Sequence, residues 1–301
     1  MRSLPPLLLL ATALLGGGCV KKIAINSLAD ALSSPSGSTF SRDDDLQLVG
    51  DALPFALKTE EALLDQAPDH VGLHLALASG YTQYAVVWVQ FPAEQLKYSD
   101  FAAYQAGLDR ARRLLQRARR YGMAGLDLVH PGFSARDLSD PAALADLTRD
   151  DVPLLYWLGA SWLATIAISK EDPEAIGQLP TAAALLHRAL DLWEDWDRGS
   201  IHELLISLEP SLPGPGGADR ARQHYARAVE LSAGTRASPH VALASGVAVD
   251  QQDRALFEEL LQKAAEVQPL PDETLANQYA QQRALWLLAH TDDLFLPPEI
   301  P

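Results

Sequence analysis

The stretch ARQHYARAV, residues 221–229, carries a spacing that recurs along the chain and decides the fold. A small residue, Ala221, is followed four positions later by the large Tyr225 and three positions after that by Ala228. On a helix these positions share one face, because residues three and four apart are neighbours on the helix surface. Small side chains let a second helix approach closely, and the large one fills the space beside them. The stretch therefore predicts a helix packed tightly against a neighbour.

The same spacing occurs at three other places, so the chain has the mark of an internal repeat. The matching sets are Ala111, Leu115 and Ala118; Ala182, Leu186 and Ala189; and Phe257, Leu261 and Ala264, in which the first residue is larger. Successive first positions lie 71, 39 and 36 residues apart, and tetratricopeptide repeats have a period of about 34 residues. We therefore predict an all-α fold of degenerate tetratricopeptide-like helical repeats, an α-solenoid. The alternative is an irregular helical bundle.

Composition supports a helical globular protein. The chain has 301 residues, of which 48% are hydrophobic and 21% charged, so it can bury a large core. Apolar residues recur three and four apart nearly to the end, as in helices. Proline and glycine clusters mark the expected helix ends: QAPDH (66–70), HPGF (130–133), SDPAA (139–143), EDPEA (171–175), LPGPGGAD (212–219), ASPH (237–240) and LPDE (270–273). The net charge of −15 and the absence of basic runs exclude nucleic acid as a partner.

The N-terminus, MRSLPPLLLLATALLGGGC (1–19), has the form of a secretory signal peptide. Its apolar segment is shorter than the roughly 20 residues that a membrane-spanning helix needs. Cys19 is the only cysteine and follows small residues, which resembles a bacterial lipobox, although Gly16 stands where leucine is usual. A conventional signal peptide with an incidental cysteine is the alternative. Val20 rather than aspartate after Cys19 favours the outer membrane, by resemblance to the enterobacterial sorting rule.

These features divide the chain into four segments. We expect a lipoprotein signal peptide at 1–18, a lipidated Cys19 with a flexible tether at 19–45, a helical-repeat domain at 46–296 and a C-terminal tail at 297–301. The tether prediction rests on the Ser, Pro and Gly content of residues 33–38. The mature protein is then a periplasm-facing body attached to a membrane by acyl chains.

No motif in the chain supports catalysis, a cofactor or a metal. His70 and His74 are four apart, but only Asp69 stands beside them as a third ligand, so structural histidines are favoured. HELLI, from His202, has Ile206 where a metalloprotease needs its second histidine. PGPGGAD (213–219) lacks the lysine of a phosphate-binding loop, and no G-x-S-x-G elbow occurs. We expect a protein that is not an enzyme, with no cofactor and no metal.

Several stretches are closer to one family than to general tetratricopeptide repeats. The chain resembles the T component, or TatT family, of tetratricopeptide-associated TRAP transporters in LPFALKTEEALL (53–64), LASGYTQYAVVWVQ (77–90), DVPLLYWLGASW (151–162), IHELLISLEP (201–210), residues 221–261, LANQYAQQRALWLL (275–288) and DDLFL (292–296). The resemblance implies a periplasm-facing lipoprotein of stacked helices, a homotrimer, and a channel through each subunit. It also implies a periplasmic solute-binding P component as partner.

Two groups of side chains are candidates for the lining of a solute cavity. Tyr81, Tyr84 and Trp88 are three and four apart, with Gln83 on another face of the same predicted helix. Aromatic stripes of this kind occur more often in a core than at a ligand site. The second group combines aromatic residues with polar residues from an otherwise apolar segment: Tyr156, Trp157, Trp162, His202, Glu203 and Glu209. Because buried polar groups need partners, the polar members indicate either an internal hydrogen-bonded network or a wet cavity.

Three functional hypotheses follow. The first is a lipid-anchored transport accessory that passes a small organic solute, amphipathic or apolar, through a cavity in concert with a solute-binding protein. The second is an envelope scaffold that docks other proteins on its repeat surface without a ligand. The third, a hydrolase, has no positive support in the sequence.

Overall fold

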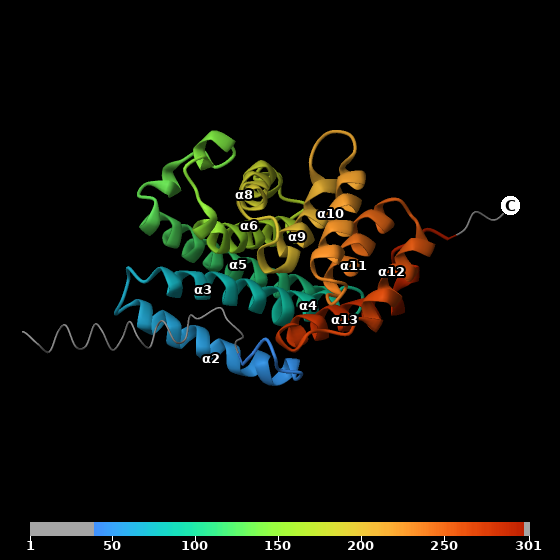
Figure 1. Ribbon diagram of the computed structural model, residues 1–301. Helices are drawn as coiled ribbons and strands as arrows, with labels where there is room; N and C mark the ends of the chain where they lie inside the picture. Colours follow the sequence, from blue (N-terminus) through green and yellow to red (C-terminus); the bar gives the residue numbers. More distant parts are fainter. Residues whose placement is uncertain (1–38, 298–301) are drawn as a thin grey trace, which may run out of the picture.

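The computed structural model describes residues 39–297, which form helices joined by short loops, with no strand in that range (Figure 1). The all-α prediction is confirmed. The α-helices are α2 (Leu46–Leu64), α3 (Val71–Ala85), α4 (Phe91–Glu94), α5 (Phe101–Val129), α6 (Val152–Ala167), α7 (Pro173–Ile176), α8 (Leu179–Leu192), α9 (Ser200–Leu208), α10 (Gly217–Leu231), α11 (Ser238–Leu243), α12 (Arg254–Glu266) and α13 (Thr274–Ala289). The signal peptide, Cys19 and most of the predicted tether lie outside the described residues, as do residues 298–301.

Shorter helical turns connect or extend these helices. Two are π-helical, η1 (Val86–Gln90) and η7 (Ala244–Ala248). The others are 3-10 turns: η2 (Phe133–Ala135), η3 (Pro141–Leu144), η4 (Arg149–Asp151), η5 (Trp196–Gly199), η6 (Glu209–Ser211), η8 (Pro271–Glu273) and η9 (Thr291–Asp293).

The helix ends fall at the proline and glycine clusters of the sequence. Aspartates cap several N-termini: Asp45 accepts a hydrogen bond from Leu48 N at the start of α2, and Asp100 accepts one from Ala103 N at the start of α5. Gly132 of the HPGF stretch follows α5 with φ at 83°, a left-handed conformation that glycine adopts without strain. The predicted breaks are therefore confirmed as local chemistry that ends one helix and starts the next.

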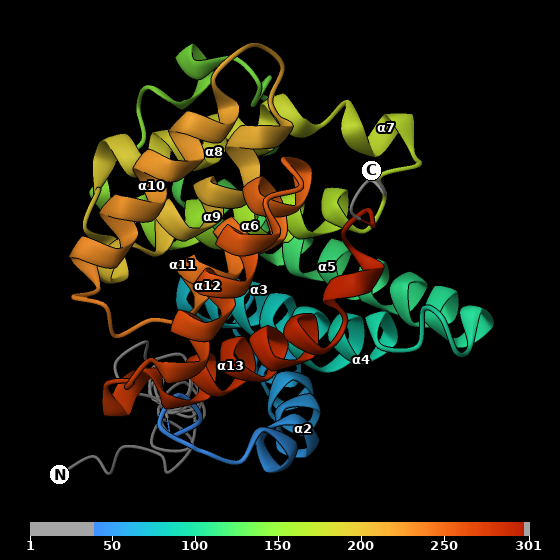
Figure 2. The same cartoon turned by 90° about the vertical axis from the view of Figure 1, so that its right-hand side faces the viewer.

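Helices that follow one another in sequence also pack against one another. α3 lies between α2 and α5, α5 packs on α6, α6 on α8, α9 on α10, and α12 on both α11 and α13. The approach is closest at small residues: a Cβ added at Gly159 would lie 2.8 Å from the side chain of Leu186. Figures 1 and 2 show the chain winding from α2 through α6 and α10 to α13.

The positions that carry the repeated spacing lie in the core. All of the small and aliphatic members are 0% exposed, as is Phe257, whereas Tyr225 is half-buried. They lie on α5, α8, α10 and α12, and each of these helices packs against the helix before or after it. The spacing therefore identified the buried face of these four helices.

The two ends of the helical array meet. Arg283 Nη1 of α13 donates to Glu94 Oε2 of α4 across 2.7 Å. The ring of Phe91 contacts the rings of Tyr279 and Trp286 edge-on, with centroids 5.6 and 6.0 Å apart. α13 also contacts α2. The last α-helix is thus attached to α2 and α4.

Substituting Ala228 should test the predicted helix contact. Ala228 is fully buried, and its backbone lies against the turn at Gly199. We expect Ala228→Trp to lower the free energy of unfolding by about 1–3 kcal/mol, because an indole overpacks the crossing. Thermal and urea unfolding would measure this. Ala226→Trp is the control, since Ala226 lies on the exposed side of the same helix; equal effects of the two substitutions would show that the register is wrong.

Candidate functional site

Tyr81 lies in a polar cluster between α2, α3 and α5. Its side chain is 3% exposed, and its hydroxyl donates to Glu61 Oε1 at 2.8 Å. The hydroxyl of Tyr121 donates to the same oxygen at 2.8 Å, and the two tyrosine rings stack at 6.0 Å. Burial and the bond to Glu61 raise the pKa of Tyr81 to about 12. Tyr81 therefore joins three helices through one carboxylate.

The other members of the first predicted group lie further along α3 and on η1. Trp88 donates from Nε1 to the carbonyl of Leu46 at 2.8 Å. Its indole fills the space above Gly50, where an added Cβ would lie 2.4 Å from the ring. Tyr84 stacks on Trp88 at 6.1 Å, while Gln83 is exposed. Trp88 thus fixes α2 against the rest of the chain.

The second aromatic group lies on α6 and is split between two faces. Tyr156 contacts Trp157 edge-on at 5.0 Å and Trp196 at 4.6 Å. Trp162 donates from Nε1 to Gln178 Oε1 at 2.5 Å. Trp157 is half-buried, and in the described part of the chain its indole nitrogen has no hydrogen-bond partner. A solute-facing role for these side chains stays a prediction.

The predicted polar residues of α9 take part in a histidine and carboxylate cluster. His202 Nδ1 lies 2.7 Å from His224 Nδ1 of α10. A neutral imidazole carries one N–H, so one ring must donate and the other accept. Burial lowers the pKa of both rings, and the charge that His202 would carry lowers that of His224 further, to about 4. The contact therefore requires that at least one ring stays neutral.

The two glutamates that the sequence singled out have protein partners. Glu209, which is 2% exposed, accepts from His187 Nε2 at 2.8 Å and from Arg220. Burial would raise the pKa of Glu209, but these two hydrogen bonds outweigh it and lower that pKa. Glu203 accepts from Arg236 Nη1 at 3.2 Å. In this structure both carboxylates belong to hydrogen-bonded networks, that of Glu209 between η6, α8 and α10, and that of Glu203 between α9 and the loop before α11.

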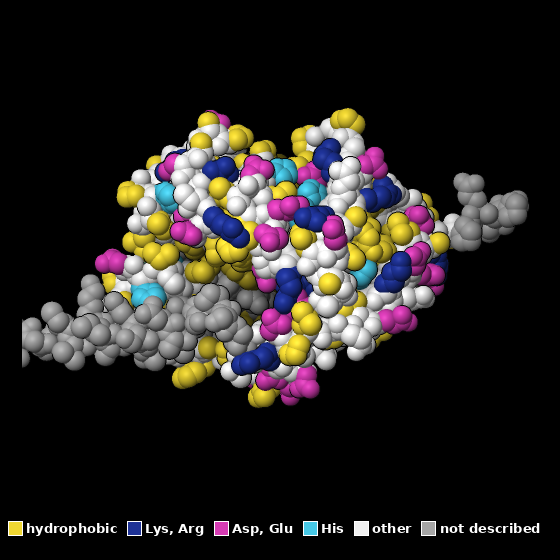
Figure 3. Space-filling view, viewed as in Figure 1, with side chains coloured by type: hydrophobic (Ala, Val, Ile, Leu, Met, Phe, Trp, Pro, Cys, Tyr) yellow, Lys and Arg dark blue, Asp and Glu magenta, His cyan; other side chains and the backbone are white. Residues whose placement is uncertain are grey.

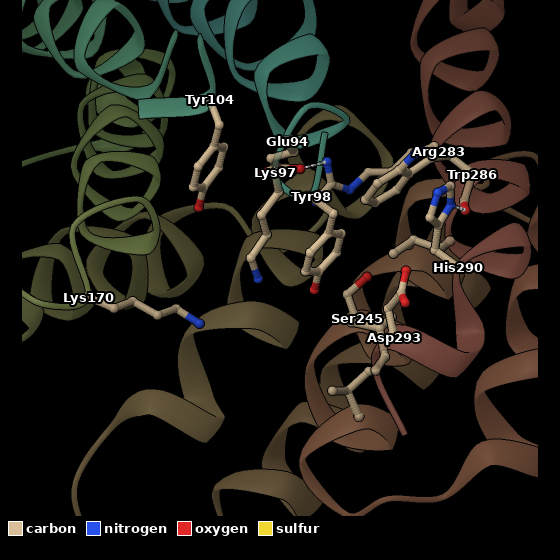
Figure 4. A pocket seen from close by; sticks show the side chains of 13 residues that line it. Glu94, Lys97, Tyr98, Tyr104, Lys170, Ser245, Arg283, Trp286, His290 and Asp293 are labelled. Atoms are coloured by element: carbon tan, nitrogen blue, oxygen red, sulfur yellow. Dashed lines mark hydrogen bonds and ion pairs between the residues drawn. The ribbon is translucent and has the colours of Figure 1, made fainter. Parts of the chain in front are cut away.

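A cavity of about 320 Å³ lies elsewhere, where segments distant in sequence meet (Figure 4). Its walls come from α4, the loop to α5 and the first turn of α5, the turn after α6, η7, and the C-terminal half of α13 with η9. Figure 2 views the face where the start of α5 and the end of α13 lie. Thirteen residues line it: Glu94, Lys97, Tyr98, Tyr104, Lys170, Ser245, Val249, Arg283, Trp286, Leu287, His290, Asp293 and Leu294. None of the ten side chains predicted from the sequence is among them.

Charge in this cavity is only partly neutralised within the protein. Arg283 is bound to Glu94, and although burial alone would lower the pKa of Arg283, Tyr279 and Glu94 raise it. Lys97 and Lys170 have no ion pair among residues 39–297. Three aromatic side chains, Tyr98, Tyr104 and Trp286, supply apolar surface. The cavity therefore suits a small organic molecule with a charged group.

One π-helical turn lines the cavity and the other leads to it. Ser245 lies within η7, and Glu94 follows η1 after one turn of α4. π-helical turns inside α-helices occur frequently at functional sites, since they redirect the side chains that follow. No local motif in the sequence marks them, and the spacing of residues along the chain does not predict this cavity.

The described structure offers no metal-binding cluster of three or more His, Cys, Asp or Glu side chains between residues 39 and 297. His70 accepts a hydrogen bond from Leu73 N at the start of α3, and His74 Nε2 lies 3.0 Å from the carbonyl of Pro68. In the same range, no helix has the length and apolar character needed to cross a membrane. Figure 3 shows acidic and basic side chains interspersed on the face that it views.

Comparison with known proteins adds two findings. A family model described as TRAP transporter T-component matches residues 42–295. A protein of Treponema pallidum (strain Nichols), described as uncharacterized, is 32% identical over 309 residues, which cover 95% of this chain and 96% of that protein.

The histidine pair should make stability depend on pH. Unfolded histidine titrates near pH 6.5, whereas the folded pKa of His224 is about 4. The unfolded state therefore binds more protons between these values, so stability is full above pH 6.5 and falls as the pH drops towards 4. From this group alone we expect a loss of roughly 2 kcal/mol between pH 7 and pH 4.5.

Urea unfolding at a series of pH values would measure this loss. His224→Gln should flatten the dependence, because glutamine can still hydrogen-bond to His202 but does not titrate. Ala226→Gln, an exposed change on the same helix, should keep the wild-type slope. An unchanged slope in His224→Gln would mean that the pair does not carry the effect.

Proposed function

The chain belongs to the TRAP transporter T-component family, and from this premise we propose that it passes a small organic solute through the cavity between α4, α5, η7 and α13. Membership makes it an accessory component of a TRAP transporter, associated with the other components and with the cell envelope. The proposed solute passage involves no catalytic step.

The observation that carries the proposal is the position of the cavity. It forms where α4 and α13 are bound together by Arg283 and Glu94. Three aromatic side chains and two lysines without ion pairs face it, a combination that suits an organic solute better than a packed core does. A scaffold that only docks proteins has no need of such a space. The scaffold is the second candidate, and the mixed charges of Figure 3 would suit it.

We also propose the cellular setting that the sequence predicts. Cys19 carries acyl chains and attaches the protein to a membrane, with the outer membrane favoured, and the helical body faces the periplasm. The helices are tetratricopeptide-like repeats, supported by the buried spacing on α5, α8, α10 and α12. The assembly is a homotrimer that partners a periplasmic solute-binding P component, as the family resemblance implies.

Removing the acyl attachment site should separate anchoring from folding. We expect Cys19→Ser to move the protein from the membrane fraction to the soluble periplasmic fraction, because acyl chains supply the membrane affinity. Its melting temperature should match that of the wild-type protein after removal of the signal peptide. Continued membrane association of Cys19→Ser would contradict the lipid anchor.

The cavity can be tested at Tyr98, which is 66% exposed, so its truncation should leave the fold intact. We expect Tyr98→Ala to reduce the small molecule that copurifies with the full-length protein about fivefold, because one aromatic contact is lost. Mass spectrometry of extracts would measure this. Phe55→Ala, at a residue 78% exposed on α2, is the matched control.

Trp157→Ala, measured in the same way, tests the aromatic group predicted from the sequence. The scaffold hypothesis gains if no small molecule copurifies with the wild-type protein isolated together with the P component. It also gains if Tyr98→Ala and Phe55→Ala behave alike.

A further inference from the structure

Charges without ion pairs stand on two different walls of the cavity, and they have opposite signs (Figure 4). We propose that the cavity binds a small zwitterionic solute with an aromatic body, its anionic group near Lys97 and Lys170 and its cationic group near Asp293. This inference rests on the proposed solute-binding function and specifies the chemical class of the solute.

The positive wall comes from two segments that are far apart in sequence. Lys97 follows α4, and Lys170 lies in the turn after α6. Neither ammonium group has an ion pair within residues 39–297, and Lys97 Nζ lies over the ring of Tyr98, 5.1 Å from its centroid. Arg283 differs, because Glu94 already neutralises it. The two lysines are therefore the groups available to a carboxylate.

The negative wall comes from η9 and η7. Asp293 is exposed and makes no ion pair in the described part of the chain, although the adjacent Asp292 pairs with Arg254 at 2.8 Å. Figure 4 shows the hydroxyl of Ser245 beside the Asp293 carboxylate, on the side of the cavity opposite Lys170. A carboxylate and a hydroxyl together can accept hydrogen bonds from an ammonium group.

Aromatic surface lies close to these two walls. Trp286 stacks on His290 at 4.6 Å, and His290 Nδ1 donates to the carbonyl of Trp286 at 2.8 Å, which fixes the ring. Tyr98 and Tyr104 come from the end where the lysines lie. Flat side chains of this kind bury an aromatic body at little entropic cost. A volume of about 320 Å³ limits the solute to a small molecule.

The solute must carry both a positive and a negative charge to match the two charged walls of the cavity. A solute with only a carboxylate would satisfy the lysines but leave Asp293 near a like charge. A solute with only an amine would satisfy Asp293 but face two ammonium groups. Like charges suppress the wrong ligand as effectively as opposite charges attract the right one. A zwitterion places each of its charges near a wall of opposite charge, so that neither faces a like charge.

Three commercially available indoles test the inference, because they share one aromatic body. L-tryptophan carries both charges, 3-indolepropionate only the carboxylate, and tryptamine only the amine. Calorimetric titration of the purified full-length protein should show L-tryptophan binding about fivefold more tightly than either of the others, as an exposed ion pair allows. Failure of L-tryptophan to bind, or equal binding of 3-indolepropionate, overturns the inference.

Variants assign each charge to its wall. Asp293→Asn should remove the advantage of L-tryptophan over 3-indolepropionate and keep its advantage over tryptamine. Lys170→Gln and Lys97→Gln should do the reverse. Lys263→Gln, outside the cavity on α12, is the control and should change nothing. If Asp293→Asn leaves the ranking unchanged, the carboxylate does not face the solute and the inference fails.

A separate result distinguishes failure of the zwitterion inference from failure of the proposed solute-binding function. Binding of 3-indolepropionate or of neutral 3-methylindole that is at least as tight as that of L-tryptophan, and that is lost in Tyr98→Ala, would keep the cavity as a solute site and refute the zwitterion. Binding of L-tryptophan that Tyr98→Ala and Asp293→Asn do not affect would place the solute elsewhere and refute both.

Discussion

The contact between Arg283 and Glu94 joins residues 189 positions apart, and both residues line the cavity that forms where their helices meet. A stack of helix pairs contacts only its neighbours and has no reason to bring its ends together. Here the ion pair, with Phe91 wedged against Tyr279 and Trp286, connects α4 to α13. Replacing both partners of a buried ion pair by well-packed apolar residues often changes stability little. Removing only one partner is costly, because it leaves a buried charge without compensation. The pair therefore specifies an arrangement more than it stabilises the chain.

Much of the fold could be predicted from the sequence because it depends on local chemistry. Prolines, glycines and capping aspartates fix where each helix begins and ends, and the spacing of Ala221 and Ala228 fixes which side of α10 is buried. The breakers that were expected to end helices do so. Helix ends and buried helix faces depend on interactions between residues only a few positions apart, so the sequence alone can predict them.

The candidate site could not be predicted in the same way. Its lining comes from four separate segments, and spacing within one helix does not tell which distant helix that helix will meet. The stripe of Tyr81, Tyr84 and Trp88 illustrates a further difficulty, since Trp88 lies within η1, where the α-helical period no longer holds. The polar residues of α9 looked equally suited to a network or a wet cavity. Their partners, such as His224 of α10 and Arg236 of the loop before α11, come from other segments and are known only in three dimensions.

The two π-helical turns have a consequence for how such a chain can change in length. A π turn holds one residue more than the α-helix needs for the same turn around the axis. A single-residue deletion within η1 or η7 can therefore be absorbed by conversion to regular α-helix, without unravelling the element. The residues downstream then keep nearly the bearing that they have now, so that Glu94 can still face Arg283. A deletion elsewhere in an α-helix turns everything downstream by about 100° around the axis. At these two points the chain can lose a residue and keep both its helices and its cavity.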